Sequence, residues 1–510
     1  MIRKFKKEYE STCDYTLPDY MGDVRKVLLT KAAVIPSGAF GSSESIDGTG
    51  IVEYNVIYLD SDGKMTAACF TSDYEISFPM DFEPESFAVD TAISSYSVHP
   101  SAPRRFSAKA TVSSELHVAN AYVDAPEGSA FEDGRAPELK RETLRAESML
   151  TAERAEREYA ETLAELGGLT ADDIEVISSG AVLRIEEAVA VTDGVNVKGT
   201  LIVTAIVRTS EQAPFAIKRE FPFEETIRIE GAAPDMSAVV SSTVSSATCT
   251  TGEGEGVATV VANVIADFDA RLIYNEDVTV TSDAYLSELD TEESYADMKY
   301  SALRGAVSTD AEISLRNLRS ESGLLDAREL LNMDFDVRKC RLDTEDGTAK
   351  IRGELAFFGI SSEISEDGAA SYSPVRFSLP FEIDLGQYAR LAPDSRVSYS
   401  VSPAGVEWSL DAENVYLRAS VNLSLHSRDE KSARRLVSCN AVGEVEYLPS
   451  PSRITVYYPE GGETLFSVAK KFHTTPAQLS LDNEITDTVS TGDSSDVSVG
   501  GTKILVRKIK

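Results

Sequence analysis

The sequence predicts a mainly β protein, made of antiparallel sheets, that ends in a small α+β module. Two long segments alternate apolar with polar residues, from Phe106 to Val118 and from Val415 to Leu425. A period of two is typical of strands with one face on a core and one in water, and such one-sided sheets are usually antiparallel. The residues from Ile454 onward have a different pattern, which reads as strand, helix, helix and strand.

Length and charge limit the class of protein. A chain of 510 residues has room for roughly three or four domains. It carries 49 Lys and Arg against 84 Asp and Glu, a formal net charge of −35. Such a polyanion repels phosphate backbones and anionic lipid, so binding to nucleic acid or to a membrane surface is not expected. The five cysteines are odd in number and form no CxxC pair, which indicates free thiols and neither a disulfide framework nor a zinc site.

Three segments of the chain repeat one order of events. In each, a glycine opens an apolar strand, an aromatic residue followed by Glu opens another strand, and a long alternating strand follows. The glycines are Gly50, Gly199 and Gly353, and the aromatic residues are Tyr74, Phe223 and Phe381. Because these anchors recur at nearly equal spacing, we expect three sheet-rich, sandwich-like repeats, over residues 15–128, 170–290 and 325–448.

The segment between the first two repeats, residues 137–168, differs in composition. Glu138 to Leu166 is rich in Ala, Glu, Arg and Leu, which favour helix, and two glycines follow as a stop signal. This composition predicts one helical linker. A weaker helical pattern runs from Glu312 to Leu331, between the second and third repeats.

Residues 453–510 are expected to fold as a compact module with the order β, α, α, β. The first helix has one apolar stripe at helical spacing, formed by Leu465, Val468, Ala469 and Phe472. Lys470 and Lys471 are expected on the opposite side of this helix. Thr475 to Gln478 has the form of a capping box with Pro at the first helical position, so a second helix should begin there.

The sequence lacks the patterns of common catalytic and metal sites. None of its four histidines has the HExxH motif or the spacing of paired metal ligands. The glycine-rich run from Gly252 to Gly256 lacks the Lys and Ser or Thr of a phosphate-binding loop, and its two Glu would repel phosphate. We therefore expect a non-enzymatic protein with no catalytic residue, no metal and no cofactor.

The final module and the repeats resemble known domains. The run from Gly462 to Phe472, continued by Thr474, Thr475, Leu479, Asn483 and Gly501, is similar to the LysM consensus over nearly the whole module. The repeats look like SPOCS domains, on segments such as Val24–Val27, Asp47–Gly50 and Ile57–Leu59. In this order the domains resemble those of spore-morphogenesis proteins of the SipL type, in which SPOCS repeats precede a LysM.

The resemblance implies a scaffold for assembly of the spore envelope and coat. Its LysM would dock on a coat morphogenetic ATPase of the stage IV sporulation protein A type, in the mother cell at the forespore surface. The alternative is a LysM that binds peptidoglycan or another N-acetylglucosamine glycan. In both cases the expected contact surface is a pair of loops, which contain Gly462, Glu463, Thr464, Leu465, Asn483 and Ile485.

Two observations favour the protein partner over the glycan. The basic N-terminus is not followed by the apolar segment of a signal peptide, and no apolar run is long enough to span a membrane, so we expect a cytoplasmic location. The stretch from Asn483 to Gly500 is also longer than is usual in a LysM and contains Asp487, Asp493 and Asp496. These acids would favour a basic protein surface. The module itself is close to neutral, with six Lys and Arg against seven Asp and Glu from Ile454 onward.

Overall fold

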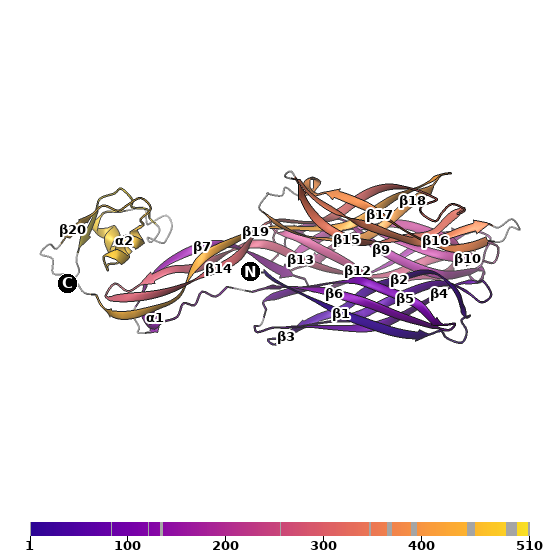
Figure 1. Cartoon of the computed structure of the whole chain (residues 1–510), viewed down its shortest axis with the longest axis horizontal. Coiled ribbons are helices and arrows are strands. Elements are labelled where there is room, and N and C mark those ends of the chain that lie inside the picture. Colours follow the sequence, from indigo (N-terminus) through magenta and orange to yellow (C-terminus); the bar gives the residue numbers. More distant parts are fainter. Residues whose placement is uncertain are drawn as a thin grey trace. The chain divides into compact units, whose positions relative to one another are not determined.

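The computed structural model describes residues 2–82, 84–120, 122–132, 136–152, 154–254, 257–345, 348–364, 370–388, 395–445, 454–485 and 497–507. Antiparallel sheets make up most of the chain (Figure 1), which confirms the predicted mainly β fold. The chain forms two compact units. Unit 1 contains Met1–Asn120, Ser148–Tyr274 and Leu303–Asp429, and unit 2 contains Ala121–Glu147, Asn275–Ala302 and Glu430–Lys510.

The first part of the chain, here called copy 1, forms two three-stranded sheets. One sheet is a meander of β2 (Val24–Gly41), β3 (Ser45–Asp60) and β4 (Met65–Pro79) in sequence order. The other sheet has the order β1 (Ile2–Thr16), β6 (Arg105–Ala119), β5 (Ser86–Ala102). All neighbouring strands are antiparallel. In the second sheet the first strand of the copy, β1, pairs with its last strand, β6.

The same strand order occurs twice more. In copy 2 the meander is β9 (Ile174–Val191), β10 (Gly194–Thr209) and β11 (Phe215–Arg228), and the second sheet joins β12 (Ser237–Gly254), β13 (Val257–Tyr285), β7 (Glu138–Thr151) and β8 (Ala155–Leu166). In copy 3 the meander is β15 (Glu329–Glu345), β16 (Thr348–Ile364) and β17 (Ala370–Asp384), and the second sheet joins β14 (Leu289–Leu318), β19 (Asn414–Glu444) and β18 (Arg396–Leu410). Each copy thus uses its first strand to pair with its last.

The remaining elements are short. Helical turns lie at α1 (Ser129–Glu132), η1 (Ala171–Asp173) and η2 (Leu385–Gln387). The C-terminal residues form β20 (Ile454–Tyr457), α2 (Leu465–Lys471), α3 (Pro476–Asp482) and β21 (Ile504–Arg507). None of the helices in the described part of the chain combines the length and apolar character needed to cross a bilayer.

The recurring glycine and aromatic anchors are cross-strand pairs. Gly199 lies opposite Phe223 in the meander of copy 2, and Gly50 with Tyr74 and Gly353 with Phe381 are the equivalent pairs. At all three glycines the ring of the partner occupies the space that a side chain would need. A Cβ at Gly50 would also lie 2.5 Å from the carbonyl oxygen of the preceding strand. Only glycine permits this close approach of ring and backbone.

Three equivalent isoleucines hold the copies together within unit 1. Ile57, Ile206 and Ile360 each lie seven positions after the glycine of their own meander, and all three belong to one buried cluster. Residues from all three meanders complete it, including Leu28, Leu331 and Tyr372. The outer faces of the meanders therefore meet in a shared apolar core, separate from the sandwich core inside each copy.

Both predicted helices between the repeats are wrong. Glu138 to Leu166 forms the strands β7 and β8, and Glu312 to Leu331 contains the end of β14 and a turn. β8 pairs with β13 from Ala155 opposite Phe268 to Leu166 opposite Ala258. Its backbone groups are satisfied by this long-range ladder, and the ladder overrides the helical preference of an Ala- and Glu-rich sequence.

This pairing also moves the start of the second and third copies. Residues 137–168 are not a linker, because β7 and β8 are the first strands of copy 2. In the same way β14 begins copy 3 at Leu289, well before residue 325, and β1 begins copy 1 at Ile2, before residue 15.

Candidate functional site

The C-terminal module in unit 2 carries the predicted binding loops. Its strands β20 and β21 pair antiparallel, from Ile454 opposite Arg507 to Tyr457 opposite Ile504. The two helices cover one face of this small sheet, and the core between them contains Leu465, Phe466, Val468, Ala469, Leu479, Val499, Ile504 and Val506. Because this core is small, the positions of the loops depend strongly on a few capping and hydrogen-bonding residues.

The first loop, before α2, is fixed by its own side chains. The Thr464 hydroxyl caps α2 by accepting a hydrogen bond from the Ser467 amide, and Ser467 Oγ in turn accepts one from the Thr464 amide at 2.9 Å. The Glu463 carboxylate accepts hydrogen bonds from the Glu460 amide at 2.7 Å and the Tyr457 hydroxyl at 2.8 Å. These bonds hold the pKa of Glu463 below its usual value. Gly462 makes the turn with a φ of +94°.

The predicted site residues of this loop therefore differ in what they can offer a partner. The Leu465 side chain is fully buried, so it shapes the loop from below. Thr464 is committed to the helix cap and Glu463 to the turn. Gly462 is exposed, and here a partner would meet mainly backbone.

The second loop follows α3 and is tied to β21. Asn483 donates to the carbonyl oxygens of Leu479 and Leu505, both at 2.8 Å, and accepts from the Leu505 amide at 2.6 Å. Ile485 is half-buried against the module core, and its carbonyl oxygen accepts a hydrogen bond from Ser480 at 2.7 Å. Asn483 is thus a clamp between helix and strand, which the sequence pattern alone did not reveal.

The first loop also pairs with the segment before β21. The Leu465 amide donates to the Val497 carbonyl at 2.8 Å, and the Val499 amide donates to the Glu463 carbonyl at 3.0 Å. These backbone hydrogen bonds hold the first loop against the segment before β21, so the loop presents a fixed backbone surface suited to recognition by shape and hydrogen bonding. The acidic residues Asp487, Asp493 and Asp496 lie outside the described residues.

The start of α3 agrees with the expected cap only in part. Thr475 accepts a hydrogen bond from the Gln478 amide at 3.1 Å, and Pro476 follows the cap. The Gln478 side chain does not return to the cap and instead donates to Asp482 at 3.0 Å.

Lys470 lies on the side of α2 away from its apolar stripe and is engaged by another part of unit 2. Its ammonium group lies 2.7 Å from Asp283 and 2.9 Å from Glu293, in the bend that joins β13 to β14 (residues 283–293, here called the β13–β14 bend). Tyr285 of the same bend is buried within the module core. The sequence shows many acidic residues in this bend and two lysines on one helix, but nothing in it indicates that they pair.

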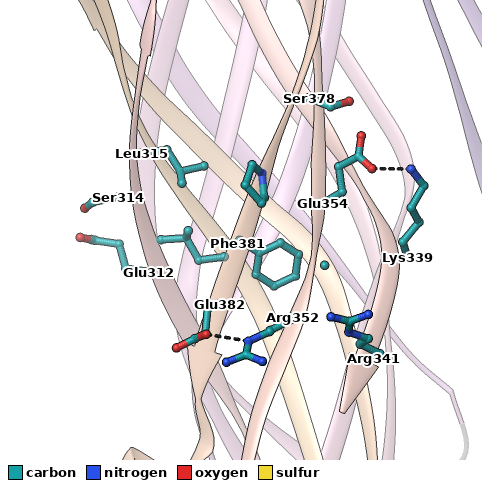
Figure 2. A pocket seen from close by; sticks show the side chains of 13 residues that line it. Glu312, Ser314, Leu315, Lys339, Arg341, Arg352, Glu354, Ser378, Phe381 and Glu382 are labelled. Carbon is teal, nitrogen blue, oxygen red and sulfur yellow. Dashed lines mark hydrogen bonds and ion pairs between the residues drawn. The ribbon is translucent and has the colours of Figure 1, made fainter. Parts of the chain in front are cut away.

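A cleft in copy 3 is a second candidate site (Figure 2). It has a volume of about 900 Å³ and is lined by residues of β14, β15, β16 and β17. Its cations are already paired. Lys339 contacts Glu354 and Arg352 contacts Glu382, each at 2.7 Å, and Arg341 lies 3.2 Å from Asp343. An anionic ligand would have to displace these carboxylates, so the cleft is a weaker candidate than the module.

A partly buried charge cluster joins copies 1 and 2 inside unit 1. Arg271 makes two hydrogen bonds to the Asp90 carboxylate, at 2.9 and 2.7 Å, and His117 Nε2 lies 3.1 Å from the same group. The surroundings of Asp90 would raise its pKa, but Arg271 and His117 hold it well below its usual value, although the side chain itself is 42% exposed. Burial lowers the pKa of His117. The Arg271 guanidinium neutralises the carboxylate, which is typical of a structural ion pair.

In the described part of the chain, no group of three or more His, Cys, Asp or Glu is arranged to hold a metal ion.

Comparison with known proteins gives one match. The family model of the SipL SPOCS domain matches residues 173–251. This range begins at the end of η1, contains the whole meander of copy 2 and ends within β12. No curated protein and no solved structure matches the chain.

Proposed function

We propose that this SipL-type sporulation protein, identified by its SPOCS domain, is a non-enzymatic scaffold for assembly of the spore envelope and coat. The three copies form the body of the scaffold. The C-terminal LysM-type module is its docking head and binds a coat morphogenetic ATPase of the stage IV sporulation protein A type. The site of action is the mother cell, at the surface of the forespore.

One observation carries this proposal. The SPOCS match covers a meander and a following strand whose order recurs in copies 1 and 3, so the SPOCS architecture extends over most of unit 1. A body of three fused sandwiches with a shared apolar core is suited to hold other proteins at fixed distances.

The construction of the module supports a docking role. The loops are held in one shape before a partner binds, because the polar groups of Glu463, Thr464 and Asn483 form hydrogen bonds within the module. Preorganised loops lose little conformational entropy on binding. Glycan binding by the same loops is the alternative, and a LysM-type βααβ order is what favours it.

Direct binding measurements separate the two functions. The full chain and a chain ending at Pro451 are tested against the purified ATPase and against insoluble peptidoglycan. We expect the full chain to bind the ATPase and the truncated chain to lose at least about tenfold in affinity, or 1.4 kcal/mol. Equal ATPase binding by both chains, together with sedimentation of the full chain on peptidoglycan, would overturn the scaffold proposal.

A loop variant localises the contact. Glu463→Gln weakens the hydrogen bonds that fix the first loop, so it should reduce binding while the core stays folded. Glu444→Gln is the matched control, because it removes the same charge from an exposed position in unit 2. Equal binding by the two variants would exclude the first loop from the contact.

A further inference from the structure

The β13–β14 bend meets the C-terminal module through a buried tyrosine. Tyr285 is only 2% exposed, and its ring lies edge-on to Phe466 with 5.1 Å between the ring centroids. Its hydroxyl donates a hydrogen bond of 2.6 Å to the carbonyl oxygen of Thr474, in the turn between α2 and α3. The bend therefore supplies an aromatic side chain to the core of a module that is far away in sequence.

Charged residues surround this tyrosine. Lys470, on α2, lies between Asp283 at 2.7 Å and Glu293 at 2.9 Å, and all three side chains are largely shielded from water. These carboxylates raise the pKa of Lys470, although burial alone would lower it. His473 Nε2 lies 3.5 Å from Asp290. Lys470 and His473 of the module thus lie against carboxylates of the bend around an apolar centre, which is the arrangement of a specific interface.

We propose that the β13–β14 bend is an intramolecular docking site for the C-terminal module. The docked corner contains Phe466, Lys470 and Thr474, so a partner cannot reach it while the bend is bound. The exposed turn at Gly462 and the exposed Glu484 lie outside this corner and belong to the face left for a partner. This second statement rests on the proposed function, whereas the docking itself does not.

Hydrogen exchange in the full chain tests the docking. Tyr285→Ala and Lys470→Glu should each raise the rate of amide exchange in residues 466–474 by about tenfold or more. In these variants the segment can open without the free-energy cost of breaking the interface. The double variant Asp283→Lys with Lys470→Glu reverses the ion pair and should restore slow exchange. Lys503→Glu is the control, since it reverses an exposed charge in the same module and should leave exchange unchanged.

The reversed pair separates undocking from unfolding. If Lys470→Glu simply unfolded the module, the added Asp283→Lys substitution would not rescue it. Equal exchange in the native chain, Tyr285→Ala and Lys470→Glu would overturn the docking. A carbodiimide cross-link between Lys470 and Asp283 or Glu293 in the native chain, identified by mass spectrometry, is also expected, and its absence would contradict the interface.

ATPase binding tests the second statement on its own. Tyr285→Ala should weaken binding, because the loops are no longer presented in a fixed position. Raised exchange with unchanged ATPase binding would overturn the role of docking in presentation while the docking and the proposed function remain. No ATPase binding by the native chain would overturn the proposed function and leave the exchange results intact.

Discussion

The glycine of each meander offers the sharpest test of the fold. An alanine at Gly199 would place its Cβ against the Arg184 carbonyl oxygen and 2.9 Å from the Phe223 ring. The contact with the carbonyl oxygen would be even closer than the 2.5 Å contact that an alanine would make at Gly50. Contacts between such atoms normally lie beyond 3.4 Å. Neither neighbour can yield freely, because the carbonyl belongs to the paired strand β9 and the ring is buried. Overpacking of this kind costs about 1–3 kcal/mol, and backbone involvement places Gly199→Ala at the upper end.

The measurement is a thermal unfolding curve. Gly199 belongs to unit 1, which contains 374 residues, so a loss of about 3 kcal/mol should lower the Tm by roughly 4 °C, because the entropy of unfolding grows with the number of residues. Gly180→Ala is the matched control in the same sheet, because its Cβ would meet nothing within 4 Å. It should be neutral or stabilise by up to about 1 kcal/mol. The loss should also be smaller for Gly353→Ala, where the nearest backbone oxygen lies at 3.0 Å. Equal Tm values for Gly199→Ala and Gly180→Ala would refute the steric argument.

Three further predictions concern single side chains. Leu465→Ala should lower the free energy of unfolding of the module by about 2–5 kcal/mol, and by more than Phe472→Ala, because Leu465 is fully buried and Phe472 only partly. Hydrogen exchange of the module measures both losses. Stability should fall as pH drops below 6.5, where the unfolded chain protonates His117 first, and again below 3.8, where the unfolded chain protonates Asp90 first. Asp90→Asn should reduce this second loss, measured as Tm against pH, because other carboxyls with a lowered pKa, such as Asp411, contribute the rest. Cys69 is exposed, yet desolvation by its neighbours and the nearby Glu53 carboxylate raise its pKa to about 12. Iodoacetamide at pH 8 should therefore modify it about a hundredfold more slowly than in urea, and equal rates would contradict this.

The sequence predicts the recurrence of the meanders because each meander requires particular residue types at particular positions. Gly50, Gly199 and Gly353 must be glycine, and an aromatic residue must follow at the distance set by the hairpin. The equivalent isoleucines were not recognised as a set. Nothing in a single strand distinguishes a residue such as Ile206 in the shared core from one that faces its own sandwich. The run from Leu201 to Val207 is apolar at nearly every position, so apolar residues lie on both faces of the strand.

The two strands β7 and β8 could not be predicted in the same way. Glu138 to Leu166 favours helix residue by residue, and no alternation of polarity marks it as a strand. Its conformation is decided by β13, which runs for 29 residues and offers ladder hydrogen bonds along that length. The topology of copies 1 and 3, in which the first strand always pairs with the last, is the signal that a repeat-based argument could have used.

The docking of the module changes how its charge should be understood. From the sequence the module is close to neutral, which suggests a surface that any partner can approach. Lys470 is neutralised by Asp283 and Glu293, so its charge does not contribute to the free face. Glu460 and Glu484 remain exposed near the loops. The face left for a partner is therefore more negative than the module as a whole, and the complementary surface on the partner should be basic, since like charges across an interface are costly.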